Sequence, residues 1–131
     1  MQGNYSVRIE KYAESHYIKS FAKKHNNHWD ITLKAIIISL EHIDTLLLTD
    51  KAEIISDVAG VKIIKTKFTV AKSGISAKTS GNRCIVAWHK EEQFVSILLV
   101  FGKTDFSGHN ETEEWKSIIR DNYPEYKDLC K

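Results

Sequence analysis

The sequence has no hydrophobic run long enough to cross a membrane. Its strictly apolar segments, such as residues 35–38 and 97–101, fall far short of the ~18 residues of a membrane-spanning helix. Residues 1–11 lack the basic stretch, apolar core and small-residue cleavage site of a secretory signal. We therefore expect a cytoplasmic protein that does not enter a membrane.

Cysteine is scarce, and metal-binding patterns are missing. Cys84 and Cys130 form no CxxC or other metal-type spacing. A disulfide between them is the less favoured interpretation, and Cys84, within a predicted strand, is better explained as a small core residue. His25 and His28 could bind a metal only with partners that the sequence does not supply. We therefore expect no metal and no cofactor.

The composition lacks the signs of a disordered or repetitive chain. The 131 residues are 42% hydrophobic and 27% charged, as in ordinary globular proteins, and they contain no repeat, linker or low-complexity tract. A chain of this length can bury a core without metals or several disulfides. We expect one domain over residues 1–131 that folds alone.

Acidic residues are absent from residues 62–90, which we call the basic segment, although the net charge of the whole chain is only +2. The cations of this segment are Lys62, Lys65, Lys67, Lys72, Lys78, Arg83 and Lys90. Such a distribution predicts a surface that meets phosphates. The alternative is a solvated sheet edge whose lysines prevent aggregation between strands. The length of the acid-free run favours binding.

The N-terminal half predicts a strand followed by two helices. Apolar and polar residues alternate over residues 5–12, as in a half-buried strand. Ser15 can cap a helix over residues 16–25, and Asn27 can cap a second that runs to about Leu48. The second helix carries an apolar stripe formed by Trp29, Leu33, Ile36, Leu40, Ile43 and Leu47. Packing on the sheet is favoured over a coiled-coil dimer, because fewer than three heptads are present.

The C-terminal half predicts strands and a last helix. After a polar stretch at residues 50–60, strands are expected over residues 62–72, 83–90 and 94–101, the last apolar on both faces like a central strand. One face of the first carries Ile64, Phe68 and Val70, and the other Lys65, Lys67 and Thr69. Residues 73–82, rich in Gly and Ser, predict a mobile hairpin loop. Asn110 can cap a helix that stops before Pro124 and leaves a charged tail.

These elements predict an α+β fold, in which an N-terminal strand and a helical hairpin pack on an antiparallel sheet with a short C-terminal helix. Residues 64–119 combine a lysine-bearing strand, a basic loop, Arg83 opening the next strand, a charged turn and an apolar strand that closes with Gly102 and Lys103. This segment resembles the RelE/ParE toxin superfamily, especially RelE and HigB-like toxins. It covers about half of the chain, and the first 60 residues match only in the order of elements.

The resemblance implies a ribosome-dependent mRNA endonuclease, the toxin of a type II toxin–antitoxin system. Such proteins enter the ribosomal A site and cut the mRNA displayed there. The implied partners are the ribosome, mRNA and a cognate antitoxin protein, with a monomeric toxin inside the toxin–antitoxin complex.

The resemblance also implies roles for individual residues. Lys65 and Lys67 correspond to the paired strand lysines of the family, Arg83 to its strand-opening arginine, and Lys103 to the residue that closes the central strand. RelE itself also uses a basic residue just after that point and a tyrosine near the C-terminal helix. Thr104 and the region of residues 109–110 stand there in this chain, and Tyr123 is a poor substitute because it lies near the helix end. The general acid and base are therefore left open.

The cations suit metal-free RNA cleavage, in which the 2′-hydroxyl attacks the phosphate. The reaction needs a base, a stabiliser of the dianionic phosphorane and an acid for the leaving 5′-oxygen. Lys65 and Lys67 point to one face, so each lowers the proton affinity of the other. Arg83 can grip a phosphate through two parallel hydrogen bonds, and Lys103 adds a further cation.

Several other side chains have two interpretations each. His109, in a loop where the family places functional groups, is either a proton carrier or a surface residue, and it is a better candidate than His89. Trp88 could stack on a base but is better placed in the core. The other predicted RNA contacts are Lys62, Lys72 and Lys78. The remaining histidines are interpreted as structural or solvated, namely His16, His25, His28 and His42.

Two other functions compete with the nuclease. A ParE-like gyrase inhibitor shares the fold but generally lacks the cationic set, so Lys65, Lys67 and Arg83 argue against it. A catalytically silent module would use the basic sheet only to hold RNA or an acidic partner. Missing proton carriers would favour that module.

Overall fold

One five-stranded sheet organises the chain, and its strand order is β1-β5-β4-β3-β2. The computed structural model describes residues 4–25, 28–102, 105–106 and 110–131. The strands are β1 (Ser6–Ile9), β2 (Ala52–Val58), β3 (Val61–Lys67), β4 (Arg83–His89) and β5 (Phe94–Phe101). β1 runs parallel to β5 and the other pairs are antiparallel, so the predicted α+β class is confirmed with a mixed sheet.

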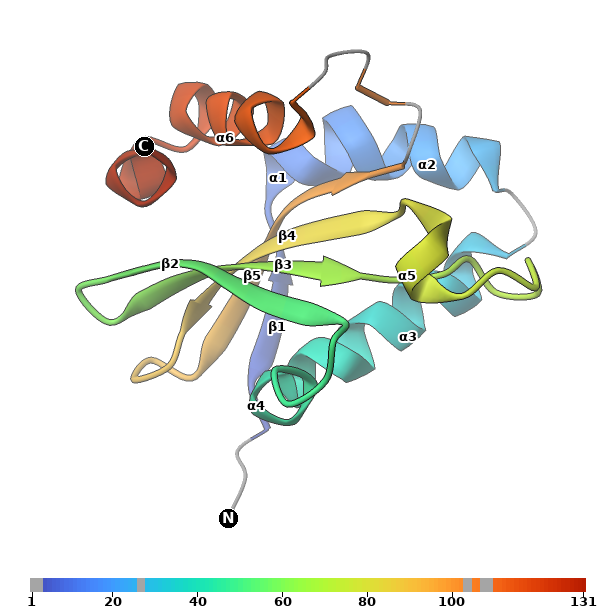
Figure 1. The fold of residues 1–131 in the computed structure, drawn as a ribbon, viewed down its shortest axis with the longest axis horizontal. Helices are drawn as coiled ribbons and strands as arrows, with labels where there is room; N and C mark the ends of the chain where they lie inside the picture. The colour runs from blue at the N-terminus through green and yellow to red at the C-terminus, as the bar shows by residue number, and fades with distance from the viewer. Residues whose placement is uncertain (1–3, 26–27, 103–104, 107–109) are drawn as a thin grey trace.

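Helical segments cover both faces of this sheet. In chain order they are α1 (Lys11–Ala13), the π-helical segment η1 (Glu14–Ile18), α2 (Lys19–Lys24), α3 (Trp29–Glu41), α4 (Ile43–Leu46), α5 (Ala77–Ser80), α6 (Glu111–Asn122) and the 3₁₀ helix η2 (Pro124–Cys130). In Figure 1 the sheet lies between α3 with α4 on one side and α6 with η2 on the other. No helix within the described part of the chain is both long and apolar enough to pass through a bilayer.

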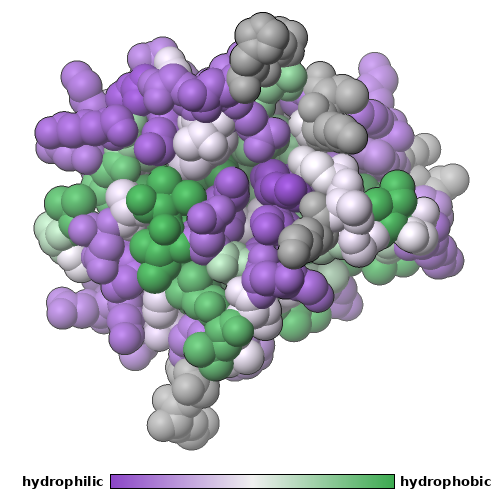
Figure 2. All heavy atoms as spheres, viewed as in Figure 1, coloured by the Kyte–Doolittle hydropathy of each residue, from purple (hydrophilic) through white to green (hydrophobic). Residues whose placement is uncertain are grey.

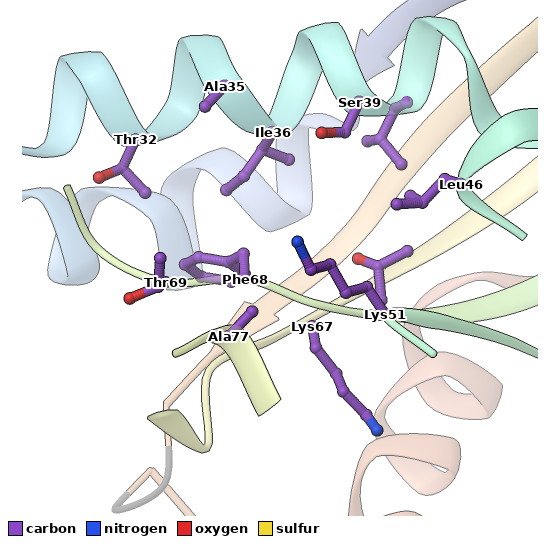
Figure 3. A pocket seen from close by; sticks show the side chains of 12 residues that line it. Thr32, Ala35, Ile36, Ser39, Leu46, Lys51, Lys67, Phe68, Thr69 and Ala77 are labelled. Carbon is purple, nitrogen blue, oxygen red and sulfur yellow. The ribbon is translucent and has the colours of Figure 1, made fainter. Parts of the chain in front are cut away.

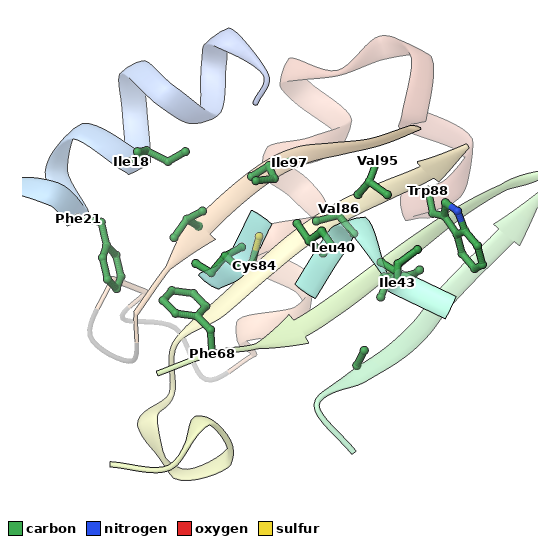
Figure 4. Packing of buried hydrophobic residues seen from close by; sticks show 14 of the residues in the cluster. Ile18, Phe21, Leu40, Ile43, Phe68, Cys84, Val86, Trp88, Val95 and Ile97 are labelled. Atoms are coloured by element: carbon green, nitrogen blue, oxygen red, sulfur yellow. The ribbon is translucent and has the colours of Figure 1, made fainter. Parts of the chain in front are cut away.

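Each face of the sheet packs against its own hydrophobic cluster. On the α3 face, Leu40 and Ile43 pack with Val86 and the apolar residues around it (Figure 4). On the opposite face, Trp115 and Ile119 of α6 pack with the other side chains of β4 and β5. Burial of each such side chain contributes about 1.5–3 kcal/mol. The predicted burial of both faces of β5 is confirmed. Of the predicted helical stripe, Trp29, Ile36, Leu40 and Ile43 are buried, and Leu33 and Leu47 are partly buried and pack against the same cluster.

Two predicted boundaries in the N-terminal half are wrong. β1 ends at Ile9 and helical structure begins at Lys11, so the Ser15 hydroxyl donates to the Lys11 carbonyl inside the helix (2.8 Å) instead of capping it. The reason is tertiary, since Ala13 is fully buried and draws this turn onto the sheet. The second helix is interrupted at His42, and the predicted cap Asn27 lies outside the described residues.

The predicted polar stretch at residues 50–60 instead contains an edge strand. β2 pairs with β3 alone, and its register shifts between Ile54 and Ser56. This bulge breaks the two-residue alternation by which strands are recognised in sequence. The backbone hydrogen bonds of β2 are non-local, so no local pattern revealed them.

The end of the chain is more ordered than predicted. The Asn110 side chain accepts a hydrogen bond from the Glu113 backbone (3.1 Å), and α6 stops before Pro124, so the predicted cap and end are confirmed. The predicted charged tail is wrong, because it folds as η2 and buries Tyr126 and Cys130. Both cysteines are free, and the prediction of Cys84 as a core residue is confirmed.

Candidate nucleic-acid interface

Two predicted site residues, Lys67 and Arg83, meet at one corner of the sheet. They are register partners at the paired ends of β3 and β4, and Arg83 is in turn opposite Phe101 of β5. Because side chains alternate along a strand, Lys67 shares its face with Ile63, which packs in the cluster of α6. Figure 3 accordingly shows the Lys67 side chain pointing away from α3. We call this position the Lys67–Arg83 corner.

The segment before β4 holds Arg83 in place. Its Nη1 donates to the carbonyl oxygens of Asn82 (2.9 Å) and Ala77 (3.4 Å). The Ser80 hydroxyl donates to the Phe68 carbonyl (2.7 Å), and Gly81 takes the positive φ of 77° that lets the chain leave α5 and enter β4. The predicted hairpin loop therefore contains a short hydrogen-bonded helix that orients the guanidinium.

The lysines of β3 differ in their electrostatic surroundings. The Lys65 ammonium lies 3.3 Å from Glu53, and the Lys62 ammonium lies 3.3 Å from Asp57. Both carboxylates come from β2, the strand that the sequence did not reveal. Lys67 makes no ion pair with any residue that the structure describes. The basic segment thus contains no acidic residue, but two carboxylates from β2 lie beside its lysines in the folded chain.

The other predicted contacts are distributed over different parts of the molecule. Trp88 is buried at 4% exposure with its ring edge-on to Tyr5, so it lies in the core as the sequence favoured. Lys72 is exposed in the loop after β3 with a φ of 65°. Lys103 and His109 lie outside the described residues, and so does the side chain of Lys78.

Several groups that could carry a proton lie away from the corner and are already engaged. His89, at the far end of β4, has its Nε2 2.7 Å from the Tyr126 hydroxyl and stacks on Phe94. The Tyr123 hydroxyl donates to the Leu98 carbonyl (2.8 Å), and burial raises the pKa of Tyr123. Burial, followed by the charge of Glu10, raises the pKa of Tyr126 to about 12. These groups are engaged in hydrogen bonds within the fold, away from the corner.

Two residues that sequence reasoning missed also reach this end of the sheet. The Asp105 carboxylate accepts a hydrogen bond from the Gly102 backbone (2.5 Å) at the end of β5. A Cβ at Gly102 would lie 3.2 Å from Oδ1 of Asn82, which places the Asn82 side chain against the same turn. No local pattern marks either residue, because only the pairing of β4 with β5 brings them together. The described residues contain no group of three or more His, Cys, Asp or Glu side chains suited to a metal.

A pocket of about 220 Å³ lies behind the corner, between α3 and β3 (Figure 3). Ile36, Leu40 and Phe68 supply apolar lining, and the Lys51 side chain points into the space. Lys51 has no ion-pair partner in the part of the chain that the structure covers. The pocket thus combines an apolar lining with an ammonium group that no described carboxylate pairs with.

Comparison with known proteins gives a match by structure but none by sequence. The sequence matches no family model, and no curated protein matches it significantly. Among solved structures, a chain of the archaeal RelE–RelB complex from Pyrococcus horikoshii OT3 superposes with a TM-score of 0.51. The chain has the RelE fold. At 14% identity the match covers 79% of this chain and 99% of the RelE–RelB chain, so the likeness lies in the fold and not in the residues.

Proposed function

We propose that this RelE-fold chain is the toxin of a type II toxin–antitoxin system and cuts mRNA on the ribosome. The observation that carries the proposal is the Lys67–Arg83 corner, where a lysine without an ion-pair partner among the described residues faces an oriented arginine across two strand ends. The same fold occurs in a RelE–RelB complex. The proposed cellular partners are the ribosome, mRNA and a cognate antitoxin.

The corner supports metal-free transesterification. The ribose 2′-oxygen attacks the neighbouring phosphorus and loses its proton to a base, while the bond from phosphorus to the 5′-oxygen breaks and that oxygen takes up a proton. In this proposal Arg83 binds the non-bridging phosphate oxygens through parallel N–H donors. Lys67 stabilises the second negative charge that develops on the phosphorane. His109 remains the predicted proton carrier.

The ribosome contributes what the corner lacks, which is alignment of the RNA. Cations attract a phosphate from many directions and fix its orientation weakly, whereas in-line attack requires the 2′-oxygen opposite the leaving oxygen. A codon held in a fixed geometry supplies this constraint. Cleavage is therefore expected to require translating ribosomes.

The experiment that tests the function is incubation of the protein with translating ribosomes, followed by mapping of the mRNA ends. The proposal expects new 5′ ends within codons on the ribosome and far slower cutting of naked mRNA. Equal rates on naked mRNA would contradict the dependence on the ribosome. Binding without new ends would instead support a silent RNA-binding module, which the hydrogen bonds that engage His89, Tyr123 and Tyr126 favour as the second candidate. Inhibition of gyrase without mRNA cleavage would indicate the ParE-like alternative.

The acids of β2 are expected to weaken RNA binding by neutralising Lys62 and Lys65. The double variant Glu53→Gln/Asp57→Asn should therefore bind single-stranded RNA several-fold more tightly at low salt, with a steeper salt dependence. Fluorescence anisotropy of a labelled RNA across a salt series measures both quantities. The matched control is Asp121→Asn/Glu125→Gln, which removes two exposed acids from α6 and η2 and changes the net charge equally. An equal gain in both double variants would show that net charge alone acts.

A further inference from the structure

A second pocket of about 300 Å³ lies on the other side of the strand that carries Arg83. It is formed where the end of α2 and the start of α3 meet the segment between β3 and β4, at one end of the molecule in Figure 1. The polar side chains that line it include Lys24, His25, His28 and Asn82. We call this space the histidine pocket.

Three of these side chains have hydrogen-bonding groups that the protein does not use. Nδ1 of His28 is buried and has no hydrogen-bond partner. Within the described residues, the His25 ring and the Asn82 amide make no side-chain hydrogen bond, although the His25 ring packs against Phe21 with centroids 4.6 Å apart. Buried polar groups are nearly always satisfied, so the unpartnered His28 nitrogen points to an external partner. The partly exposed His25 ring and Asn82 amide line the same pocket and are open to that partner.

The chemistry of these groups favours a neutral, flat partner over a bare phosphate. Burial, followed by the charge of Lys24, lowers the pKa of His25, so its ring is neutral at pH 7. A neutral imidazole and a carboxamide each present donors and acceptors together, which is how protein side chains read the edge of a base. Val70, Ala71 and Ile75 add apolar lining for the faces of a ring. A phosphate would need several cations, and among the described residues Lys24 is the one lysine or arginine that lines the pocket.

The histidine pocket is connected to the Lys67–Arg83 corner through the backbone. Asn82 lines the pocket and is followed directly by Arg83, and the Asn82 carbonyl accepts a hydrogen bond from the Arg83 guanidinium (2.9 Å). Asn82 directly precedes β4, so the pocket and the corner lie beside the start of the same strand. One nucleotide can span such a step, with its phosphate at Arg83 and its base turned out of the stack.

We propose that the histidine pocket binds one unstacked nucleobase of the RNA strand, whose edge is read by His25, His28 and Asn82. This inference rests on the proposed function and deepens it, because the pocket would select the base beside the phosphate that is cut. The single-stranded form is required, because a paired base offers neither its face nor its inner edge.

Direct binding tests the pocket without the ribosome. The probes are the four ribonucleoside 5′-monophosphates, with ribose 5-phosphate as the matched compound without a base, and histidine side-chain NMR signals of the wild-type protein are the readout. At least one nucleotide should shift the signals of His25 and His28 but not that of His89, and ribose 5-phosphate should leave all three unchanged. Equal shifts with ribose 5-phosphate, shifts confined to His89, or no shift at millimolar nucleotide would each overturn the proposal.

Variants then connect the pocket to cleavage. His25→Phe keeps an aromatic ring beside Phe21 but removes its hydrogen-bonding nitrogens, and Asn82→Ala removes the amide. Each should weaken nucleotide binding by roughly tenfold, the value of one hydrogen bond to a desolvated partner, and should alter the base preference at the mapped mRNA ends. The control is His42→Phe at an exposed histidine outside the pocket. If both pocket variants still cleave mRNA with an unchanged base preference, the base-binding proposal is overturned and the nuclease function stands. If the protein binds nucleotides in the pocket but never cleaves mRNA, the base-binding proposal stands and the nuclease function is overturned.

Discussion

Replacing Lys67 by alanine is expected to lower the rate of ribosome-dependent mRNA cleavage by about 10²- to 10³-fold, the usual effect of removing one stabiliser of transition-state charge. The reason is that Lys67 faces Arg83 at the open end of the sheet and has no acidic partner in the described structure. Its partly buried side chain has no ion pair among the described residues, so the free energy of unfolding should change by less than about 1 kcal/mol. Single-turnover cleavage of mRNA on programmed ribosomes measures the rate, and urea denaturation measures the stability.

Arg83→Ala should cause a loss of similar size with an additional effect on the neighbouring loop. Its guanidinium donates to the carbonyls of Ala77 and Asn82, so its removal also releases the segment before β4. Arg83→Lys separates the two roles, since a lysine retains the positive charge without the planar fork that binds two phosphate oxygens. We expect Arg83→Lys to remain strongly impaired in cleavage and to unfold at nearly the wild-type urea concentration.

Comparison among lysines makes the prediction specific. Lys65→Ala should reduce cleavage less than Lys67→Ala, because Glu53 lies 3.3 Å from the Lys65 ammonium and compensates its charge. Lys19→Ala, on the exposed surface of α2, should leave the rate unchanged. Wild-type cleavage by either Lys67→Ala or Arg83→Ala would remove that residue from the site. Equal losses in Lys65→Ala and Lys67→Ala would show that ion pairing does not rank these lysines.

The second large effect concerns a partner protein that carries an acidic, amphipathic segment. Such an antitoxin is expected to bind across the basic sheet and the neighbouring helices and to abolish cleavage. The outer face of α3 offers an apolar margin, since Ile31 and Ile38 are 54% and 50% exposed and Ala35 lies between them. Figure 2 shows further hydrophobic patches over β2 and around α4. Lys51 adds a positive charge beside this margin in the pocket under α3.

Charge should mainly affect the rate constant for association of the antitoxin, and buried apolar area should mainly affect the rate constant for its dissociation. Long-range attraction speeds the encounter of oppositely charged surfaces, so higher ionic strength should slow association. Exposed ion pairs contribute only about 0–1 kcal/mol each, so dissociation, limited by buried apolar contacts, should change much less. RNA binding, dominated by phosphate contacts, should weaken steeply with salt. Stopped-flow mixing with the product of the adjacent gene at several salt concentrations measures both rate constants.

Variants on α3 test where this partner binds. Ile38→Asp should raise the dissociation rate at least tenfold, because a carboxylate replaces an apolar contact within the expected interface. The control is Ile75→Asp, an isoleucine of comparable exposure (52%) in the loop before α5. Equal effects of the two variants would show that the α3 margin is not the contact. If the neighbouring gene product neither binds the chain nor restores growth to cells that express it, the toxin function loses its main biological support and the silent binding module is preferred.

Local patterns in the sequence were sufficient to predict the elements whose signals come from residues close together in the chain. The stripe of α3 follows the helical repeat, β5 is apolar except for Ser96, and the Asn110 cap and Pro124 mark both ends of α6. These patterns involve residues close in the chain, so they can be recognised in the sequence without knowledge of the fold. The order of these elements, together with the lysine and arginine positions, was also enough to predict the RelE fold.

Tertiary structure decided which of the cations at the candidate site are compensated. The register of β2 with β3 places Glu53 opposite Lys65 and Asp57 opposite Lys62, and the pairing of β3 with β4 places Lys67 opposite Arg83. The sequence of residues 62–90 contains no acid, and nothing local in it reveals the two carboxylates that lie beside it in space. Opposite charges in a sheet interact across strands, so the field at the site depends on strand order and register, which arise only when the chain folds.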